Sequence, residues 1–384
     1  MKENTVKNIG IYVHIPFCKS KCYYCDFTSF DNKENYIEKY IKCVNKEIEF
    51  SSKVPKIVTT IYIGGGTPSS IDEKYIESIL KTIYKNYKVI DNAEITIEVN
   101  PGTCTLKKLK AYKNMGINRL SIGLQSSNDK LLKEIGRIHN YSQYEKTIEY
   151  AKKVGFKNIS TDMIIGLPNQ TIYDIEDTLN KLLNLEIKHI SVYSLIVEEN
   201  TKMYDLINTK KLLLPDDEIE RYMYWYAKRK LEDNGFIHYE VSNFALPGYM
   251  SIHNMDCWSQ KRYFGFGVSA SSFVSNTRFT NTSCIETYIK NIENKKFLQN
   301  KKIDEVLDEE GLQKEYIMLG LRKLAGFNIY DFIKKFRINP LKTYNKNFEK
   351  LFKQNLLEID YSNMNIKLTH KGLDFANIVW EEFV

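Results

Sequence analysis

The sequence predicts an α/β fold, in which six parallel strands alternate with helices and a small winged-helix-like α+β domain follows at the C-terminus. Six short runs rich in β-branched and aromatic residues recur along the first half of the chain, and longer segments with helical periodicity separate them. After about residue 304 the pattern changes to short helices and a hairpin. Strands that alternate with helices favour right-handed βαβ units and hence a parallel sheet. Periodicity alone leaves open whether this sheet is flat or curled into a barrel.

The predicted strands follow one another along the first half of the chain. They are Asn8–His14, Thr59–Ile63, Ala93–Val99, Arg119–Gly123, Asn158–Ile164 and His189–Leu195. Between the first two, apolar residues recur at helical spacing over Ile37–Ile48 and form one face of a helix. We expect a further helix over Pro215–Asn234. The aromatic-rich stretch His238–Phe279 has no clear period, so we expect irregular structure there.

The C-terminal part begins with helical periodicity over Leu312–Leu324, for which Gly326 is the expected C-cap. The later elements are predicted helices over Ile329–Phe336 and Tyr344–Gln354, a hairpin of Leu357–Asp360 with Ile366–Leu368, and a last helix with Thr369 as N-cap. We therefore divide the chain into residues 1–240, which hold the alternating strands and helices, an aromatic-rich connecting segment at 241–303, and the winged-helix-like domain at 304–384.

The composition indicates a protein with a large buried core. Of the 384 residues 43% are hydrophobic, and the net charge of +7 is spread along the chain without a dense basic block. We find no secretory signal and no apolar run long enough to cross a membrane, and seven cysteines, an odd number, do not suggest a disulfide framework. We therefore expect a cytoplasmic protein. Lys346, Lys350 and Lys353 lie on one predicted helix, but such a group is more often a solvated face, so we expect no nucleic-acid partner.

Three cysteines within eight residues, Cys18, Cys22 and Cys25, are the strongest chemical signal in the sequence. They lie directly after the first predicted strand, at the carboxyl end of the sheet, where α/β folds place their sites. A cubane iron–sulfur cluster normally takes four thiolates. Three thiolates leave one iron open, and that iron can chelate the amino and carboxylate groups of an amino acid. The alternatives are chance clustering and a zinc site, for which His14 would be the only nearby fourth ligand.

The triad spacing, with Tyr24 directly before the third cysteine, resembles the radical-SAM superfamily. Further motifs resemble the oxygen-independent coproporphyrinogen III oxidase family and its close relatives, the HemW-type haem chaperones. These motifs are Ile11–Cys18, Gly64–Ser69, Glu98–Pro101, Ser121–Gln125, Gly136–His139, Asp162–Pro168 and the pair His253–Asn254 followed by Trp258. The resemblance implies an incomplete six-stranded (β/α)6 barrel, which holds a [4Fe–4S] cluster on the three cysteines and binds S-adenosylmethionine against it.

Several predicted strands end in glycines or polar residues that suit a ligand site. Glycines after the second strand let the backbone approach a ligand, an acidic residue after the third can bind ribose hydroxyls, and an arginine can hold a carboxylate. The resemblance assigns these residues to the S-adenosylmethionine environment: Tyr12, Tyr24, Gly65, Gly66, Thr67, Glu98, Gln125, Arg137 and Asp162. Taken singly, the glycines could form only a tight turn, Glu98 could be structural and Tyr12 could belong to the core.

Two features favour the haem chaperone branch of the family. Phe27 stands where the oxidase branch has a fourth cysteine, and only about ten residues precede the first predicted strand, where the oxidase branch has a long extension. In the chaperone branch a His-Asn pair followed by Tyr-Trp is associated with haem binding, which makes His253 a candidate haem contact. Cys257 replaces the tyrosine and could be a soft axial ligand or a spare buried thiol. His253 could instead be a packed residue, and Ser271 stands where the family usually has a histidine.

The resemblance therefore implies a haem chaperone, which binds haem, a [4Fe–4S] cluster and S-adenosylmethionine and transfers haem to an acceptor protein. The alternatives are an oxygen-independent coproporphyrinogen III oxidase, which decarboxylates two propionates, and a radical-SAM enzyme for another substrate. The implied partners are haem, an unidentified haem acceptor and an electron donor such as flavodoxin or ferredoxin. Membrane association would be peripheral, through the acceptor.

Overall fold

The computed structural model describes residues 8–52 and 56–384. Six parallel strands form its centre, as the sequence predicts. They are β1 (Asn8–Ile15), β2 (Ile57–Gly65), β3 (Lys88–Val99), β4 (Arg119–Gln125), β5 (Asn158–Ile165) and β6 (His189–Ser194). Each strand pairs in parallel with the next one along the chain.

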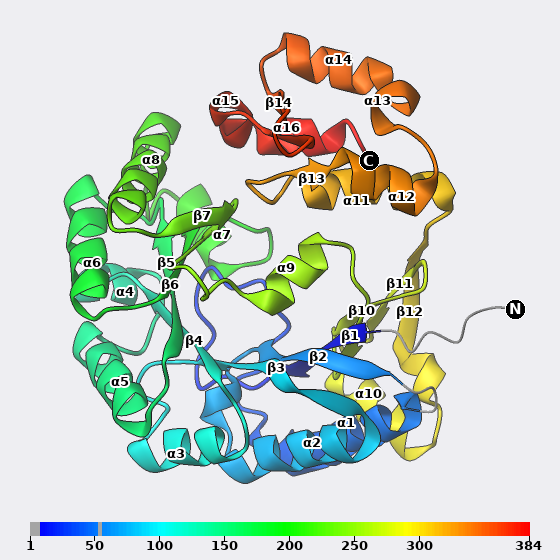
Figure 1. Ribbon diagram of the computed structural model, residues 1–384. Helices are drawn as coiled ribbons and strands as arrows, with labels where there is room; N and C mark the ends of the chain where they lie inside the picture. Colours follow the sequence, from blue (N-terminus) through cyan, green and yellow to red (C-terminus); the bar gives the residue numbers. More distant parts are fainter. Residues whose placement is uncertain (1–7, 53–55) are drawn as a thin grey trace, which may run out of the picture.

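The strand order shows that the sheet is a partial barrel. Strands β1 to β6 lie side by side in the order of the sequence. In a doubly wound sheet, by contrast, the strand order reverses at a switch point. Because every crossover then has the same hand, the helices gather on the outer face, as Figure 1 shows. These helices are α1 (Ile37–Ser51), α2 (Glu73–Asn86), α3 (Leu106–Asn114), α4 (Asp129–Glu134), α5 (Tyr141–Val154) and α6 (Ile172–Asn184). Strand β1 does not pair with β6, so the barrel stays open.

Additional strands extend the sheet at both edges, which corrects the expectation of irregular structure over His238–Phe279. Their bounds are β7 (Ile237–Glu240), β8 (Asn243–Ala245), β9 (Tyr263–Phe266), β10 (Ser271–Val274), β11 (Thr277–Asn281) and β12 (Lys301–Val306). Strand β8 pairs antiparallel with β6, and β9 pairs parallel with β1. Each of β7 to β11 has only three to five residues, too few for a clear alternation of polar and apolar side chains.

The remaining helices of this part are α7 (Lys202–Asn208), α8 (Asp217–Asp233), α9 (Ile252–Trp258) and α10 (Ile285–Glu293), with short 3-10 helices at Glu34–Tyr36, Pro68–Ser70 and Phe297–Asn300. The helix predicted over Pro215–Asn234 is α8. Helix α9 lies inside the open barrel (Figure 1). The buried carboxylate of Glu94 on β3 accepts hydrogen bonds from the backbone amides of Ile252 and His253, both at 3.0 Å, and so anchors the start of α9.

The C-terminal elements form a second hydrophobic core. They are α11 (Glu309–Gly320), β13 (Phe327–Asn328), α12 (Ile329–Phe336), α13 (Pro340–Thr343), α14 (Asn345–Lys353), β14 (Leu357–Asp360), β15 (Asn365–Leu368), α15 (His370–Asp374) and α16 (Ala376–Glu381). The predicted hairpin is confirmed, and Thr369 caps α15. Gly326 is not the C-cap of α11, which ends at Gly320; its backbone has a φ of +73° in the turn before β13, and a Cβ there would lie 1.9 Å from the carbonyl oxygen of Ile366. The boundary predicted between residues 303 and 304 falls within β12.

Arg322 joins this second core to α9. Its guanidinium lies 4.3 Å from the ring centre of Trp258 on α9 and 4.5 Å from that of Trp380 on α16. The backbone beside it also pairs with the barrel, because the amide of Val241 donates to the carbonyl of Arg322 at 3.1 Å. The C-terminal elements are therefore fastened next to α9, over the open side of the barrel (Figure 1).

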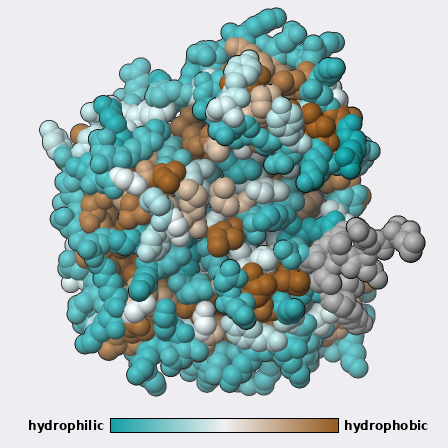
Figure 2. Space-filling view, viewed as in Figure 1, coloured by the Kyte–Doolittle hydropathy of each residue, from teal (hydrophilic) through white to brown (hydrophobic). Residues whose placement is uncertain are grey.

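The surface seen in Figure 2 is mostly hydrophilic, with small separated groups of hydrophobic residues instead of one continuous apolar band. None of the described helices combines the length and the apolar composition that a bilayer-spanning segment needs.

Candidate functional site

The inner face of the barrel is polar and encloses a cavity of about 440 Å³. Paired positions on parallel strands point to the same face, and the pairs Glu98–Ser121 and Asp162–Ser191 both point inward. The inward residues that line the cavity are Tyr62, Glu98, Arg119, Ser121, Gly123, Ser160, Asp162, Ile164, His189, Ser191 and Tyr193. The alternate residues, such as Ile61, Ile97 and Ile122, face the helices and belong to the main hydrophobic core. The interior of this barrel is therefore hollow, with polar groups from several strands set among apolar surface, and of a size that suits a small-molecule ligand.

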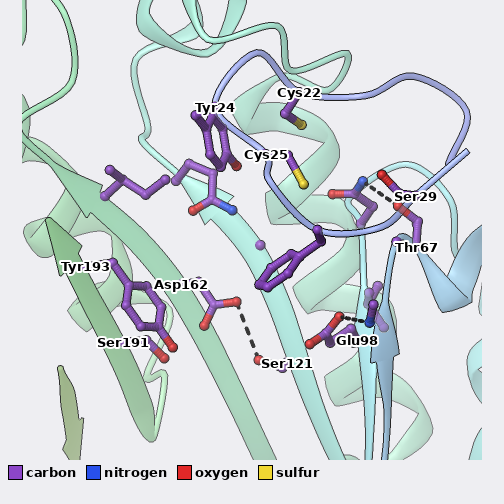
Figure 3. Close-up of a pocket in the computed structure, with 18 of the residues that line it drawn as sticks. Cys22, Tyr24, Cys25, Ser29, Thr67, Glu98, Ser121, Asp162, Ser191 and Tyr193 are labelled. Carbon is purple, nitrogen blue, oxygen red and sulfur yellow. Dashed lines mark hydrogen bonds between the residues drawn. The ribbon is translucent and has the colours of Figure 1, made fainter. Parts of the chain in front are cut away.

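The loop after β1 carries the three cysteines to the carboxyl ends of the strands, where they line the cavity. Backbone hydrogen bonds join the two ends of this loop. The amide of Cys18 donates to the carbonyl of Phe30 at 3.0 Å, and the amide of Phe30 donates to the carbonyl of Pro16 at 2.6 Å. The middle of the loop is held by the Tyr23 amide, which donates to the Ile135 carbonyl at 3.0 Å. The loop is thus shaped by the fold, and Figure 3 shows Cys22 and Cys25 on it above the strand ends.

His14, the only candidate for a fourth zinc ligand, has both ring nitrogens engaged. Its Nε2 donates to the carbonyl of Thr28 at 2.8 Å, and its Nδ1 accepts from the hydroxyl of Tyr12 at 2.9 Å. Burial lowers the pKa of His14, in keeping with a neutral ring. Within residues 8–52 and 56–384, no three His, Cys, Asp or Glu side chains converge on a point where they could bind a single metal ion. His14 therefore has no ring nitrogen left over for a zinc ion.

The cysteine loop fits a cluster in which each thiolate binds a different iron. Cys18, Cys22 and Cys25 are free thiols, all partly exposed toward the cavity. Gly66 leaves room for this site, because a Cβ there would lie only 3.0 Å from the Sγ of Cys18. Thr67 supports the same cysteine from the side, with its hydroxyl oxygen 3.5 Å from the sulfur.

Glu98 holds the glycine-rich end of β2. One carboxylate oxygen accepts from the backbone amide of Gly65 at 3.0 Å, and the other accepts from the hydroxyl of Tyr62 at 3.0 Å. Burial raises the pKa of Glu98 to about 7, although both hydrogen bonds favour the ionised form. Gly65 has a φ of +115°, and a Cβ there would lie 2.6 Å from the ring of His14. The glycine-rich motif is therefore required by the contacts of the chain itself, before any ligand is considered.

Arg137 connects the cysteine loop to the ends of β3 and β4. Its Nη1 lies 3.6 Å from the sulfur of Cys22, and its Nη2 donates to the Gly123 carbonyl at 2.6 Å and to the side chain of Asn100. The amide nitrogen of Asn100 donates in turn to the hydroxyl of Thr67 at 3.2 Å. This chain of contacts places a fixed positive charge beside the three thiols.

Asp162 and Gln125 complete the predicted set. The carboxylate of Asp162 lies 3.5 Å from the hydroxyl of Ser121, and burial raises its pKa (Figure 3). Gln125 ends β4 with a φ of +72° next to a register shift, so its backbone adopts a left-handed conformation that is costly for a residue with a side chain. The side chain of Gln125 lines the cavity.

Three predicted residues do not line the cavity. Tyr12 contacts His14 and stacks on Tyr62. His253 is buried on α9, where its Nδ1 lies 2.8 Å from the hydroxyl of Thr60, and burial lowers its pKa to about 4. Cys257, one turn later, is also largely buried, and its pKa is raised to about 12 by burial. Their neighbours Ser251 and Asn254 do reach the cavity.

Sequence reasoning missed several residues of the cavity wall. Tyr62, Asn100, Ser121, Ser191 and Tyr193 all line it. The available signal was the period of two in each strand, in which polar residues alternate with isoleucine, leucine or valine. The strands were predicted from β-branched and aromatic residues alone, and an (α/β) barrel usually has an apolar, packed interior, so polar residues within the strands did not stand out as wall residues.

Part of the rim of the cavity is apolar and exposed, beside the exposed charged residues Lys21, Asp26 and Glu198. Phe27, Tyr193 and Ile196 line it, and their exposed fractions are 62%, 41% and 67%. Leu195 lines the same edge. Exposed aromatic and aliphatic side chains that gather at a cavity mouth suit a flat apolar ligand better than a highly charged one.

Comparisons with known proteins agree with this description. Residues 12–182 match the model of the Radical SAM superfamily. The chain is 37% identical to the heme chaperone HemW of Bacillus subtilis over 97% of this chain and 98% of that protein, and 36% identical to the heme chaperone HemW of Lactococcus lactis over 97% and 96%. Among solved structures, the coproporphyrinogen III oxidase HemN from Escherichia coli has the same fold, with a TM-score of 0.86 and 20% identity over 98% of this chain and 90% of that one. The chain belongs to the radical SAM superfamily and, within it, to the family of the HemW heme chaperones.

Proposed function

We propose that this protein is a haem chaperone, which binds haem in the open barrel and transfers it to an acceptor protein. The observation that carries the proposal is the similarity to proteins named heme chaperone HemW, which extends over 97% of the chain and so includes both the barrel and the C-terminal elements. The exposed apolar part of the rim around Phe27, at the place where the oxidase branch has a fourth cysteine, supports a flat apolar cargo.

Cys18, Cys22 and Cys25 would hold a [4Fe–4S] cluster, whose open iron would bind the amino acid part of S-adenosylmethionine. Gly65, Gly66 and Thr67 would border that part, while Glu98, Gln125, Arg137 and Asp162 would supply polar contacts, with Tyr24 and Tyr12 close by. When bound, the cluster supplies an electron that can cleave S-adenosylmethionine. The chain itself supports this site by keeping Arg137 beside Cys22 and by holding the Gly65 amide with Glu98.

For haem, His253 is the more suitable iron ligand of the two candidates. Its Nδ1 contacts Thr60, and within the described residues its Nε2 has no hydrogen-bond partner, so this nitrogen is left for a metal. Only 7% of His253 is exposed, so α9 would have to move away from β2 before iron could reach the ring. Cys257 lies one turn further along the same helix and would be an alternative ligand.

The proposed partners are haem, an acceptor protein that the chain does not identify, and a one-electron donor such as flavodoxin or ferredoxin. We place this activity in the cytoplasm, and any membrane contact would be made through the acceptor.

The test is an anaerobic haem titration of the cluster-reconstituted protein, followed by the Soret band. We expect stoichiometric binding by the wild type, weaker binding by His253→Ala, and unchanged binding by the control His370→Ala, which removes a histidine stacked on Trp225. A parallel sample receives coproporphyrinogen III, a reductant and S-adenosylmethionine. Formation of protoporphyrinogen in that sample would replace the chaperone proposal with the oxidase.

A further inference from the structure

Arg119, the first residue of β4, is a buried cation that faces the cavity. Only 2% of it is exposed, and it lines the cavity floor together with serine side chains. Its Nη1 donates to the side-chain oxygen of Asn158 at 2.9 Å and to the carbonyl of Tyr249 at 3.0 Å. Both partners are neutral, so they hold the guanidinium in place without balancing its charge.

Buried arginines are normally paired with a carboxylate. In the part of the chain that the structure describes, the partly buried Arg278 pairs with Glu315 and the exposed Arg221 pairs with Asp374, whereas the more deeply buried Arg119 has no such ion pair. Asp162 is close enough to feel the charge of Arg119, which lowers the pKa of this carboxyl, but burial has the larger effect and raises it. Arg119 therefore offers an anion a charged donor in a site that is largely shielded from water.

Asp162 is the carboxyl that interacts with the charge of Arg119, and the other groups around Arg119 are neutral hydrogen-bonding partners. His189 contacts the hydroxyl of Ser160 through Nδ1 and the hydroxyl of Tyr239 through Nε2, both at 2.7 Å. Burial, with a contribution from Arg119, lowers the pKa of His189 well below its usual value, so the ring adds no second positive charge. Ser121, Ser160 and Ser251 also line this floor. The floor thus combines one cation with several hydroxyl groups, which is the composition of a carboxylate site.

This floor is joined to the helix that carries the candidate haem ligand. Arg119 holds the carbonyl of Tyr249, and α9 begins three residues later at Ile252. Ser251 and Asn254, on either side of His253, line the cavity with Arg119. A ligand that reaches α9 from the cavity therefore passes next to the guanidinium.

We propose that Arg119 forms a carboxylate-binding subsite on the cavity floor, which anchors a propionate of the haem cargo. The choice of haem as the source of the carboxylate rests on the proposed function. The other possible source is the carboxylate of S-adenosylmethionine, and the experiment separates the two.

The experiment measures the affinity of the cluster-reconstituted protein for two pairs of ligands. The first pair is haem and haem dimethyl ester, in which both propionates are esterified; the second is S-adenosylmethionine and its decarboxylated form. Wild type, Arg119→Gln, Arg119→Lys and the control Arg229→Gln, an exposed arginine on α8, are compared. We expect the wild type and the control to prefer haem over its ester by about tenfold or more, Arg119→Gln to lose this preference, and Arg119→Lys to keep part of it.

The outcomes separate cleanly. If Arg119→Gln loses the preference for the free carboxylate only in the S-adenosylmethionine pair, Arg119 still forms a carboxylate subsite, but the carboxylate is that of S-adenosylmethionine. If wild-type protein binds neither haem nor its ester, the proposed function fails, and the second pair alone decides the subsite. Preferences that are the same in wild type and Arg119→Gln overturn the proposal. If Arg119→Gln does not fold, the wild type and Arg119→Lys are compared instead. The proposal is then overturned if the wild type binds haem and its ester with equal affinity and if Arg119→Lys prefers S-adenosylmethionine over its decarboxylated form as strongly as the wild type does.

Discussion

The guanidinium of Arg137 lies 3.6 Å from the sulfur of Cys22, and the same side chain donates to the carbonyl of Gly123 at 2.6 Å. One residue therefore joins the cysteine loop to the carboxyl end of β4. Lysine cannot make these contacts together, since its single ammonium group lacks the planar fork of arginine.

Arg137→Lys should therefore weaken S-adenosylmethionine binding, because the loop and the strand ends lose their common support. We expect a loss of affinity of about 10–100-fold, the usual effect of removing a residue that supports metal ligands. Calorimetric titration of the reconstituted protein measures it, with Arg229→Lys as the surface control. Equal affinities of wild type and Arg137→Lys would show that the contact has no role in the site.

Gly65→Ala tests whether the glycine-rich motif is needed by the fold. The residue has a φ of +115°, and a Cβ would lie 2.6 Å from the ring of His14, which holds the Thr28 carbonyl at the end of the cysteine loop. Gly155→Ala is the matched control, because Gly155 also has a positive φ, +90°, but no atom within 4 Å of an added Cβ. We expect Gly65→Ala to lower the free energy of unfolding by about 2 kcal/mol more than Gly155→Ala. Urea denaturation gives this difference, and similar losses in both variants would refute the steric explanation.

The pKa of Glu98, raised to about 7 by burial, predicts a pH dependence of stability. Because the carboxyl holds its proton more tightly in the folded state than in the unfolded state, protonation stabilises the folded protein. This contribution to the free energy of unfolding is fully present below the unfolded pKa of 4.5 and is lost as the pH rises through about 7. Between about pH 5 and about pH 8 the loss is at most about 3 kcal/mol. Glu98→Gln should remove this part of the slope, because the amide oxygen still accepts from Gly65 without gaining charge. Urea midpoints of the cluster-free protein at the two pH values measure it; parallel slopes in wild type and variant would contradict the assignment.

Arg322→Ala should loosen the C-terminal elements from the barrel. The guanidinium lies against Trp258 on α9 and Trp380 on α16, and the methyl group of alanine cannot make the cation–π interaction with either ring. The expected cost is about 1–2 kcal/mol. Thermal unfolding followed by tryptophan fluorescence measures this loss, and Arg229→Ala serves as control. An unchanged transition in Arg322→Ala would mean that the hydrophobic contacts alone hold the two parts together.

Much of the fold was predictable because it depends on local signals. The six parallel strands and the winged-helix-like hairpin follow from periodicity and capping residues such as Thr369, and these act within a few residues of chain. The edge strands β7 to β11 were missed because strands of three to five residues hold too little pattern. Gly326 was misplaced as a helix cap, since its positive φ serves a turn packed against Ile366, far away in sequence.

The local chemistry can be read from the order of the amino acids: three cysteines in one loop, the glycines after β2, and the polar residues at the strand ends. How these groups meet depends on the packing of strands and helices in the folded chain. The fold brings Arg137 into contact with Cys22, which is 115 residues away in the sequence. It also engages both ring nitrogens of His14 in hydrogen bonds and packs His253 against Thr60 on the inner wall of the barrel. It leaves Arg119 facing a hollow interior, held by Asn158 and the carbonyl of Tyr249, with no ion pair to a carboxylate in the part of the chain that the structure describes. The physical reason is that one position of the sequence gives only the type of a side chain, whereas its neighbours, burial and electrostatic surroundings depend on strands that are distant in the sequence.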